Sequence, residues 1–222
     1  MNKLAWDKLI VALDLNREKE IKRIVDELSP RVKKFKVGLI AYTLLGPNII
    51  QWLTKKKVDV FLDLKLFDIP HTMTEAVKVM TDMGVWGITV HAKSGGESLK
   101  ILADSLREHA DKKKLRKPLL VGVTELTSQV SSIDKVFSLA QDASIAGLEA
   151  VVCSVWEARQ IKTDLSLITI TPGIRAQGGD DQRRIATVAD ALRAQVDYFV
   201  VGRPIIQQAD YMDAARRLLK ST

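Results

Sequence analysis

The most chemically suggestive feature of the chain is a cluster of charged residues that directly follows an apolar run. Asp63, Lys65 and Asp68 come after Val60–Leu62, in the order acid, base, acid. Charged groups are costly inside a protein core, so we expect them at the mouth of the strand that the apolar run predicts. There the carboxylates would keep the ammonium group charged, and the ammonium group could stabilise a developing negative charge or deliver a proton.

The spacing of these residues indicates how their side chains share one pocket. In a regular strand, Asp63 and Lys65 face the same side about 7 Å apart at Cα, and Leu64 faces the opposite side. Asp68 belongs to the following loop or helix entry, because Pro70 cannot donate a strand hydrogen bond. This spacing alone also fits a solvated charge cluster at a strand end, so the rest of the chain must decide.

The elements that would position these groups are repeated βα units. Short apolar runs alternate with amphipathic segments from end to end, which is typical of a parallel sheet. The first expected helix starts near Arg17 and carries an apolar stripe. Eight strands with a helix after each predict a (β/α)8 barrel as a single domain over residues 1–222, with an open doubly wound sheet as the alternative. The expected strands are Leu9–Asp14, Lys34–Gly38, Val58–Asp63, Gly87–His91, Leu119–Val123, Ala150–Cys153, Leu167–Thr171 and Tyr198–Gly202.

A barrel enzyme keeps its functional residues at the carboxyl ends of the strands. Polar and special residues gather at these positions, namely Asp14, Lys36, Asp63, Lys65, His91, Thr124, Thr127, Pro172–Arg175, Gly202 and Arg203. The residues after the seventh and eighth strands stand where such barrels bind phosphate. Arg203 could grip a phosphate with two hydrogen bonds, and Gly202 would let the backbone come close. A structural Arg203 that caps a neighbouring helix is the alternative.

Length and composition limit the class of protein. The chain has 222 residues, 46% of them hydrophobic, which is ample for a large core. The first apolar run, Leu9–Leu13, is too short for a signal peptide or a membrane span, so we expect a soluble cytoplasmic protein with no membrane partner. Cys153 is the one cysteine, which excludes an internal disulfide, and its apolar neighbours predict a packed core residue.

The charge balance favours anionic partners, because 34 Lys and Arg face 27 Asp and Glu and leave a net charge of +7. Nucleic acid is one candidate. The densest basic runs, Lys55–Lys57 and Lys112–Lys117, lie at the ends of expected helices, where cations complement the helix dipole. No aromatic residues are interleaved with the basic residues of these runs, and no nucleic-acid motif stands beside them, so we expect no nucleic-acid partner.

Seven segments of the chain, in order, resemble the orotidine 5′-phosphate decarboxylase family, and the resemblance covers nearly the whole length. The segments are Val11–Asp14, Phe35–Gly38, Phe61–Pro70, Leu126–Ser128, Thr171–Arg175, Asp181–Arg184 and Val201–Pro204. The resemblance implies a homodimeric barrel without cofactor, whose active sites lie at the subunit interface. We also expect no metal, because the chain has no Cys/His cluster and Lys36 stands where a metal ligand would be needed. It also implies decarboxylation of orotidine 5′-monophosphate to uridine 5′-monophosphate, the last step of de novo UMP synthesis.

The same resemblance implies roles for individual residues. Lys36, Asp63, Lys65 and Asp68 match the catalytic array, with Lys65 as the proton donor and Asp68 reaching into the partner subunit's site. The implied substrate contacts are Asp14 and Lys36 to ribose, Thr72 across the interface, Thr127 to the pyrimidine, and Arg175, Gln182, Gly202 and Arg203 to phosphate. Two features depart from the pattern: His71 replaces the usual Asn, and the loop 176–181 is shorter than in some bacterial members.

Other functions compete with this interpretation. The magnesium-dependent 3-keto-L-gulonate 6-phosphate decarboxylases and hexulose-phosphate synthases share the D-x-K-x-x-D motif. They carry a Glu metal ligand near the end of the second strand, where this chain has Lys36, and a cation repels a divalent metal. A nucleotide-sensing or nucleic-acid-binding barrel is favoured only by the net charge. His91 is expected to be packed and hydrogen-bonded, because the electrostatic chemistry leaves it no necessary proton.

Overall fold

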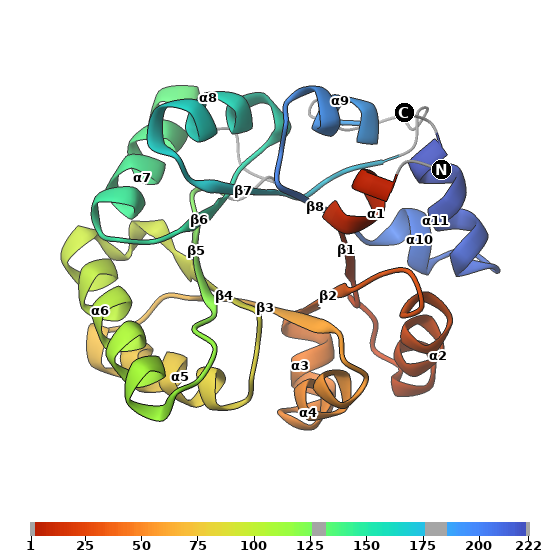
Figure 1. Ribbon diagram of the computed structural model, residues 1–222, viewed down its shortest axis with the longest axis horizontal. Coiled ribbons are helices and arrows are strands. Elements are labelled where there is room, and N and C mark those ends of the chain that lie inside the picture. The colour runs from red at the N-terminus through yellow and green to blue at the C-terminus, as the bar shows by residue number, and fades with distance from the viewer. Residues whose placement is uncertain (1–2, 126–131, 176–185, 221–222) are drawn as a thin grey trace.

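The apolar runs of the sequence form a closed barrel, as a computed structural model of the chain shows for residues 3–125, 132–175 and 186–220 (Figure 1). Within these ranges, eight parallel strands pair in sequence order, and β8 closes on β1. The strands are β1 (Leu9–Ala12), β2 (Lys34–Gly38), β3 (Asp59–Leu66), β4 (Gly87–His91), β5 (Leu119–Val123), β6 (Ala150–Val152), β7 (Ile168–Thr171) and β8 (Tyr198–Val201). The expected (β/α)8 barrel is confirmed, and the alternative of an open sheet is wrong.

The helices form an outer ring around the strands, except that α1 lies inside this ring in the view of Figure 1. They are α1 (Lys3–Lys8), α2 (Glu18–Leu28), α3 (Leu39–Leu45), α4 (Asn48–Lys55), α5 (Pro70–Asp82), the short 3₁₀ helix η1 (Ala92–Ser94), α6 (Gly96–Lys113), α7 (Ile133–Ile145), α8 (Val155–Leu165), α9 (Val188–Arg193), α10 (Arg203–Ile206) and α11 (Tyr211–Lys220). The helix expected near Arg17 is α2, and its apolar stripe is buried. Helix α1 was not expected from the sequence.

Two apolar layers result from the alternation of side chains along the strands. One set points outward and packs under the helices, as Val11, Phe35 and Leu62 do. The other set fills the barrel interior and includes Ile10, Phe61 and Val121. The barrel is therefore a packed core and not a pore.

Aromatic rings fill the interior near the amino ends of the strands. Trp86 meets Phe61 and Tyr198 edge to face, with ring centroids 5.9 and 5.0 Å apart. The ammonium group of Lys34 lies over both Trp86 and Tyr198, at 5.4 and 5.1 Å from their centroids. Because this end is filled, the carboxyl ends of the strands are where the barrel has room for a ligand.

Several smaller expectations can be compared with the fold. Cys153 is buried, and burial raises the pKa of its thiol, as expected for a packed residue. The basic runs at Lys55–Lys57 and Lys112–Lys117 begin in the last turns of α4 and α6, also as expected. Among the described helices, none has the length and apolar character to cross a membrane.

Candidate active site

A cavity of about 440 Å³ lies at the carboxyl ends of the strands. Its volume is in the range typical of small-molecule sites. Residues from strands far apart in the sequence line it, because a barrel brings all its strand ends to one face. The cavity brings together these residues singled out from the sequence: Asp14, Lys36, Asp63, Lys65, Arg175, Gly202 and Arg203.

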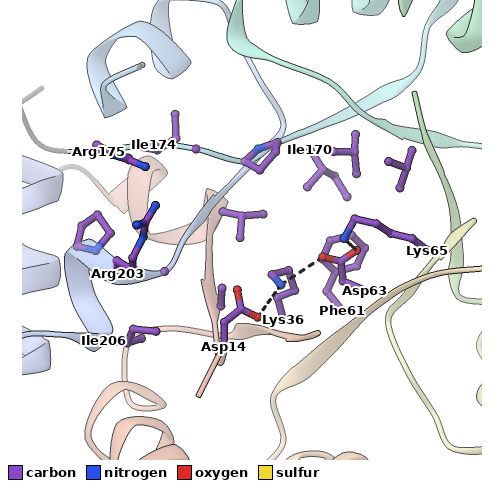
Figure 2. A pocket seen from close by; sticks show the side chains of 18 of the residues that line it. Asp14, Lys36, Phe61, Asp63, Lys65, Ile170, Ile174, Arg175, Arg203 and Ile206 are labelled. Atoms are coloured by element: carbon purple, nitrogen blue, oxygen red, sulfur yellow. Dashed lines mark hydrogen bonds and ion pairs between the residues drawn. The ribbon is translucent and has the colours of Figure 1, made fainter. Parts of the chain in front are cut away.

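Four of these residues form a row of alternating charges (Figure 2). Lys36 Nζ lies 2.9 Å from Asp14 Oδ1 and 3.2 Å from Asp63 Oδ2. Lys65 Nζ lies 2.8 Å from Asp63 Oδ1. The row therefore runs acid, base, acid, base across β1, β2 and β3, and each inner charge has an opposite charge on both sides.

The charges of the two inner residues are stabilised by their neighbours. Burial by itself would raise the pKa of Asp63, but Lys36 and Lys65 outweigh burial and hold that pKa below its ordinary value. Burial likewise opposes the charge of Lys36, and the carboxylates of Asp63 and Asp14 raise its pKa above the ordinary value. Both groups are therefore ionised around neutral pH, so the row offers a preformed electrostatic field.

A glycine at the end of β2 makes room for the row. A Cβ atom on Gly38 would lie 2.8 Å from Asp14 Oδ1 and 2.9 Å from Lys36 Nζ. Real Cβ atoms do not approach other atoms so closely, so any side chain at this position would push the ion pair apart. The glycine in the sequence Lys36-Val37-Gly38 thus leaves room for the contact between Lys36 and Asp14.

Asp63 and Lys65 share the cavity as expected, but the backbone between them is not a regular strand. The expected end of the third strand at Asp63 is wrong, because β3 continues to Leu66 through a bulge. Leu62 pairs with Ile88 and Leu66 pairs with Val90, so three residues of β3 face one residue of β4. Lys65 has a left-handed backbone with φ of 52°. This turn, and not simple alternation, directs its side chain to Asp63.

The opposite side of the cavity carries two arginines (Figure 2). Arg175 follows β7, where its N–H donates to Ala186 O at 3.0 Å. Arg203 begins α10 directly after Gly202, and its side chain is exposed. In the described ranges the Arg203 side chain donates no hydrogen bond to a backbone carbonyl and forms no ion pair, so the alternative that it caps a neighbouring helix gains no support. The two guanidinium groups can receive an anion at some distance from the charged row.

The remaining residues singled out from the sequence lie elsewhere. Asp68 is exposed in the loop after β3, as expected, and its Oδ1 accepts a hydrogen bond from Ile69 N at 2.7 Å. Thr72 and the unusual His71 are exposed in the first turn of α5. Neither Asp68 nor Thr72 lines the cavity within the described part of its own chain. Thr127, Gln182 and the loop 176–181 lie outside the described residues.

His91 is partly exposed at the end of β4, and its surroundings keep it neutral. Its Nδ1 accepts a hydrogen bond from Lys93 N at 3.3 Å, and its ring lies 5.3 Å from that of Phe67. Burial lowers the pKa of His91, and the ammonium groups of Lys93 and Lys65 lower it further against the opposing effect of Glu125. The expected hydrogen bond is present, but the ring is only partly buried and its aromatic neighbour Phe67 is exposed.

Sequence reasoning missed Glu125, which lines the cavity after β5. Its side chain is 4% exposed and lies 2.8 Å from both Lys93 Nζ and Lys135 Nζ. Hydrogen bonds from these lysines lower the pKa of Glu125. The rule that selected Thr124, a polar residue directly after an apolar strand, would also have selected Glu125.

Comparison with known proteins places the chain in a family. The model of the Orotidine 5'-phosphate decarboxylase / HUMPS family matches residues 7–218. The chain belongs to this family. An orotidine 5′-phosphate decarboxylase of Tolumonas auensis is 40% identical in an alignment of length 227 that covers 95% of the chain and 96% of that relative. One of Pseudoalteromonas atlantica is 42% identical in an alignment of length 218 that covers 91% of the chain and 93% of the relative.

The family is also recognisable in solved structures. The crystal structure of orotidine 5′-phosphate decarboxylase from Lactobacillus acidophilus aligns with a TM-score of 0.82 and 31% identity. The alignment covers 96% of this chain and 98% of that one. Both the barrel and its length are therefore shared with this decarboxylase.

Proposed function

We propose that the protein decarboxylates orotidine 5′-monophosphate to uridine 5′-monophosphate and CO₂, the last step of de novo UMP synthesis. The observation that carries the proposal is the row of Asp14, Lys36, Asp63 and Lys65 in the same cavity as Arg175 and Arg203. The relatives named above carry the name of this enzyme. The row suits the reacting end of an anionic substrate, and the arginines suit its phosphate.

The reaction needs electrostatic stabilisation. Loss of CO₂ from carbon 6 of the pyrimidine leaves an electron pair that the ring cannot delocalise, so a fixed positive charge must offset it. We assign this role to Lys65, whose ammonium group then donates the proton that carbon 6 takes up. Asp63 keeps Lys65 charged and oriented. Lys36 offsets the negative charge of Asp63. The contact between Lys36 and Asp14 holds the part of the site that we assign to the ribose.

The distant phosphate supplies binding energy for this chemistry. Arg175 and Arg203 would grip it, with Gly202 and Gln182 as further contacts, while Thr127 would contact the pyrimidine. Contacts to a part of the substrate that does not react can hold the reacting carbon beside Lys65. We expect the loss of such a contact to weaken binding of the nucleotide specifically.

We propose further that the protein is a homodimer with shared active sites. Large apolar side chains are exposed on α3 and beside Asp68: Leu39, Ile40, Leu44, Phe67 and Ile69, with Leu39 at 63% and Phe67 at 64% exposure. Apolar surface of this kind favours association with another protein surface. In a dimer formed through this surface, Asp68 and Thr72 of one subunit would reach the active site of the other. Neither residue lines the described cavity of its own chain.

The extent of the domain and the location of the enzyme belong to the same proposal. We assign residues 1–222 to one decarboxylase domain, supported by the family match over residues 7–218 and by a barrel that closes from β1 to β8. A cytoplasmic location agrees with a role in nucleotide synthesis and with the unbridged Cys153.

Activity without metal is the first expected result. Purified protein dialysed against EDTA should consume orotidine 5′-monophosphate, seen as loss of its absorbance, at the rate of untreated protein. The reason is that Lys36 stands where the magnesium-dependent members of the family need an acidic ligand. Activity that EDTA abolishes and magnesium restores would favour the sugar-phosphate alternative, and absence of activity with and without magnesium would contradict the proposed function.

Phosphate recognition gives a second expected result. Arg203→Ala should reduce kcat/KM for the nucleotide at least about a hundredfold, since a charge-assisted bidentate contact is lost. The reaction of the corresponding nucleoside, which lacks the phosphate, should hardly change. Arg216→Ala removes an exposed arginine from α11 and serves as the matched control. Equal losses for nucleotide and nucleoside would mean that Arg203 has a structural role.

A further inference from the structure

The bulge in β3 is held by a residue that sequence analysis did not single out. Thr89, in the middle of β4, is fully buried, and it is the residue that faces the bulge between Leu62 and Leu66. The backbone N–H of Lys65 donates to Thr89 Oγ1 at 2.8 Å. The hydroxyl group of Thr89 in turn donates to Asp63 Oδ1 at 3.2 Å. Thr89 thus contacts both members of the charged row that lie on β3.

The direction of these two hydrogen bonds is determined by chemistry. A backbone N–H can only donate, so Thr89 Oγ1 must be the acceptor toward Lys65. An ionised carboxylate can only accept, so the hydroxyl proton must point to Asp63. Asp63 Oδ1 also receives Lys65 Nζ at 2.8 Å. The backbone of Lys65, the hydroxyl of Thr89, the carboxylate of Asp63 and the ammonium of Lys65 therefore form a closed ring of contacts.

Lys65 needs such support because its backbone conformation is unfavourable. Its φ of 52° is in the left-handed region, which a residue with a Cβ adopts only when its surroundings hold it there. The bulge also removes the regular strand partner of the Lys65 N–H, and a buried N–H without a partner is costly. The hydroxyl group of Thr89 supplies that partner at the bulge.

We infer that Thr89 is a positioning residue for catalysis, which acts through Asp63 and Lys65 and not by contact with the substrate. Its hydroxyl group holds the Lys65 backbone in the turn that sends the ammonium group into the cavity, and it orients the Asp63 carboxylate that receives this ammonium group. The inference rests on the proposed decarboxylation. The charged residues themselves come from the ends of β1, β2 and β3. Strand β4 contributes the hydroxyl group that orients two of them.

Isosteric substitution tests the inference. Thr89→Val keeps the volume and removes the hydroxyl group, whereas Thr89→Ser keeps the hydroxyl group. We expect Thr89→Val to lower kcat at least about tenfold with KM for orotidine 5′-monophosphate changed less than about twofold, because the phosphate contacts remain. Thr89→Ser should keep more than about half of the wild-type kcat. If Thr89→Val does not fold, Thr89→Ala compared with Thr89→Ser gives the same contrast.

Thr169 offers a matched control on the other side of the barrel. It is also fully buried, and its hydroxyl group also joins a backbone N–H to a carboxylate, accepting from Asp197 N at 3.2 Å and donating to Asp197 Oδ2 at 3.3 Å. Asp197 directly precedes β8, so this pair lies near the amino ends of the strands. Thr169→Val should therefore lower the midpoint of thermal unfolding about as much as Thr89→Val and leave kcat unchanged.

The pH dependence of kcat distinguishes a positioning role from a general loss of stability, which would not shift it. A hydrogen bond donated to a carboxylate favours its ionised form, so its loss raises the pKa of Asp63. The acid limb of kcat should move to higher pH in Thr89→Val and stay in place in Thr89→Ser and Thr169→Val. A kcat within twofold of wild type in Thr89→Val, or an equal loss of kcat in Thr169→Val, would overturn the inference. Inactive wild-type protein would instead refute the proposed function.

Discussion

Replacement of Lys65 by alanine is expected to reduce the kcat for orotidine 5′-monophosphate at least about a thousandfold, which corresponds to a barrier about 4 kcal/mol higher. The ammonium group is the cation that Asp63 orients at 2.8 Å, and it is also the assigned proton donor. KM should change much less, because Arg175 and Arg203 lie on the other side of the cavity (Figure 2). Single-turnover loss of substrate absorbance measures the effect.

The fold should survive this substitution. The Lys65 side chain is 36% exposed, and Asp63 keeps its contact to Lys36 at 3.2 Å, so no buried charge is left without a partner. Circular dichroism and the midpoint of thermal unfolding should match those of Lys100→Ala, which removes an exposed lysine from α6. Retention of a tenth or more of the wild-type kcat would refute the assignment of Lys65 as the proton donor.

Mixing two inactive variants should restore activity if the site is shared between subunits. In a heterodimer of Lys65→Ala and Asp68→Ala, one site receives both defects and the other site receives neither. With random exchange about half of the dimers are mixed and each has one intact site, so about a quarter of wild-type activity should return. The measurement is the decarboxylation rate after subunit exchange, verified by co-purification of differently tagged chains.

A second mixture controls for rescue by other means. Asp63 and Lys65 come from the same strand and share one cavity, so a heterodimer of Lys65→Ala and Asp63→Asn carries one defect in each site. This mixture should stay inactive after exchange. If the mixture with Asp68→Ala also stays inactive despite verified exchange, Asp68 does not reach the partner's site, and the proposal of shared sites is wrong.

The barrel was predictable from the alternation of short apolar runs with amphipathic segments. Most of its site was predictable from the polar residues at the strand ends. Strands β2, β4 and β5 have the bounds that the sequence predicts. Of these, β5 is apolar throughout, as expected of a parallel strand covered on both faces. The grouping of Asp14, Lys36 and Asp63 follows from topology alone, since a parallel barrel brings every carboxyl strand end to one face.

Contacts between strands decided the rest. The sequence around Lys65 shows no glycine to announce a left-handed turn, and the turn is held by a hydroxyl group on β4 that is 24 residues away along the chain. Glu125 stays buried and charged because Lys93 and Lys135 arrive from other elements. The sequence by itself thus determined that Asp14, Lys36, Asp63 and Lys65 meet at the mouth of the barrel, because the local hydrophobic pattern shows where each strand ends. Only the tertiary structure decided how they are oriented, because hydrogen bonds between distant segments set the backbone of β3.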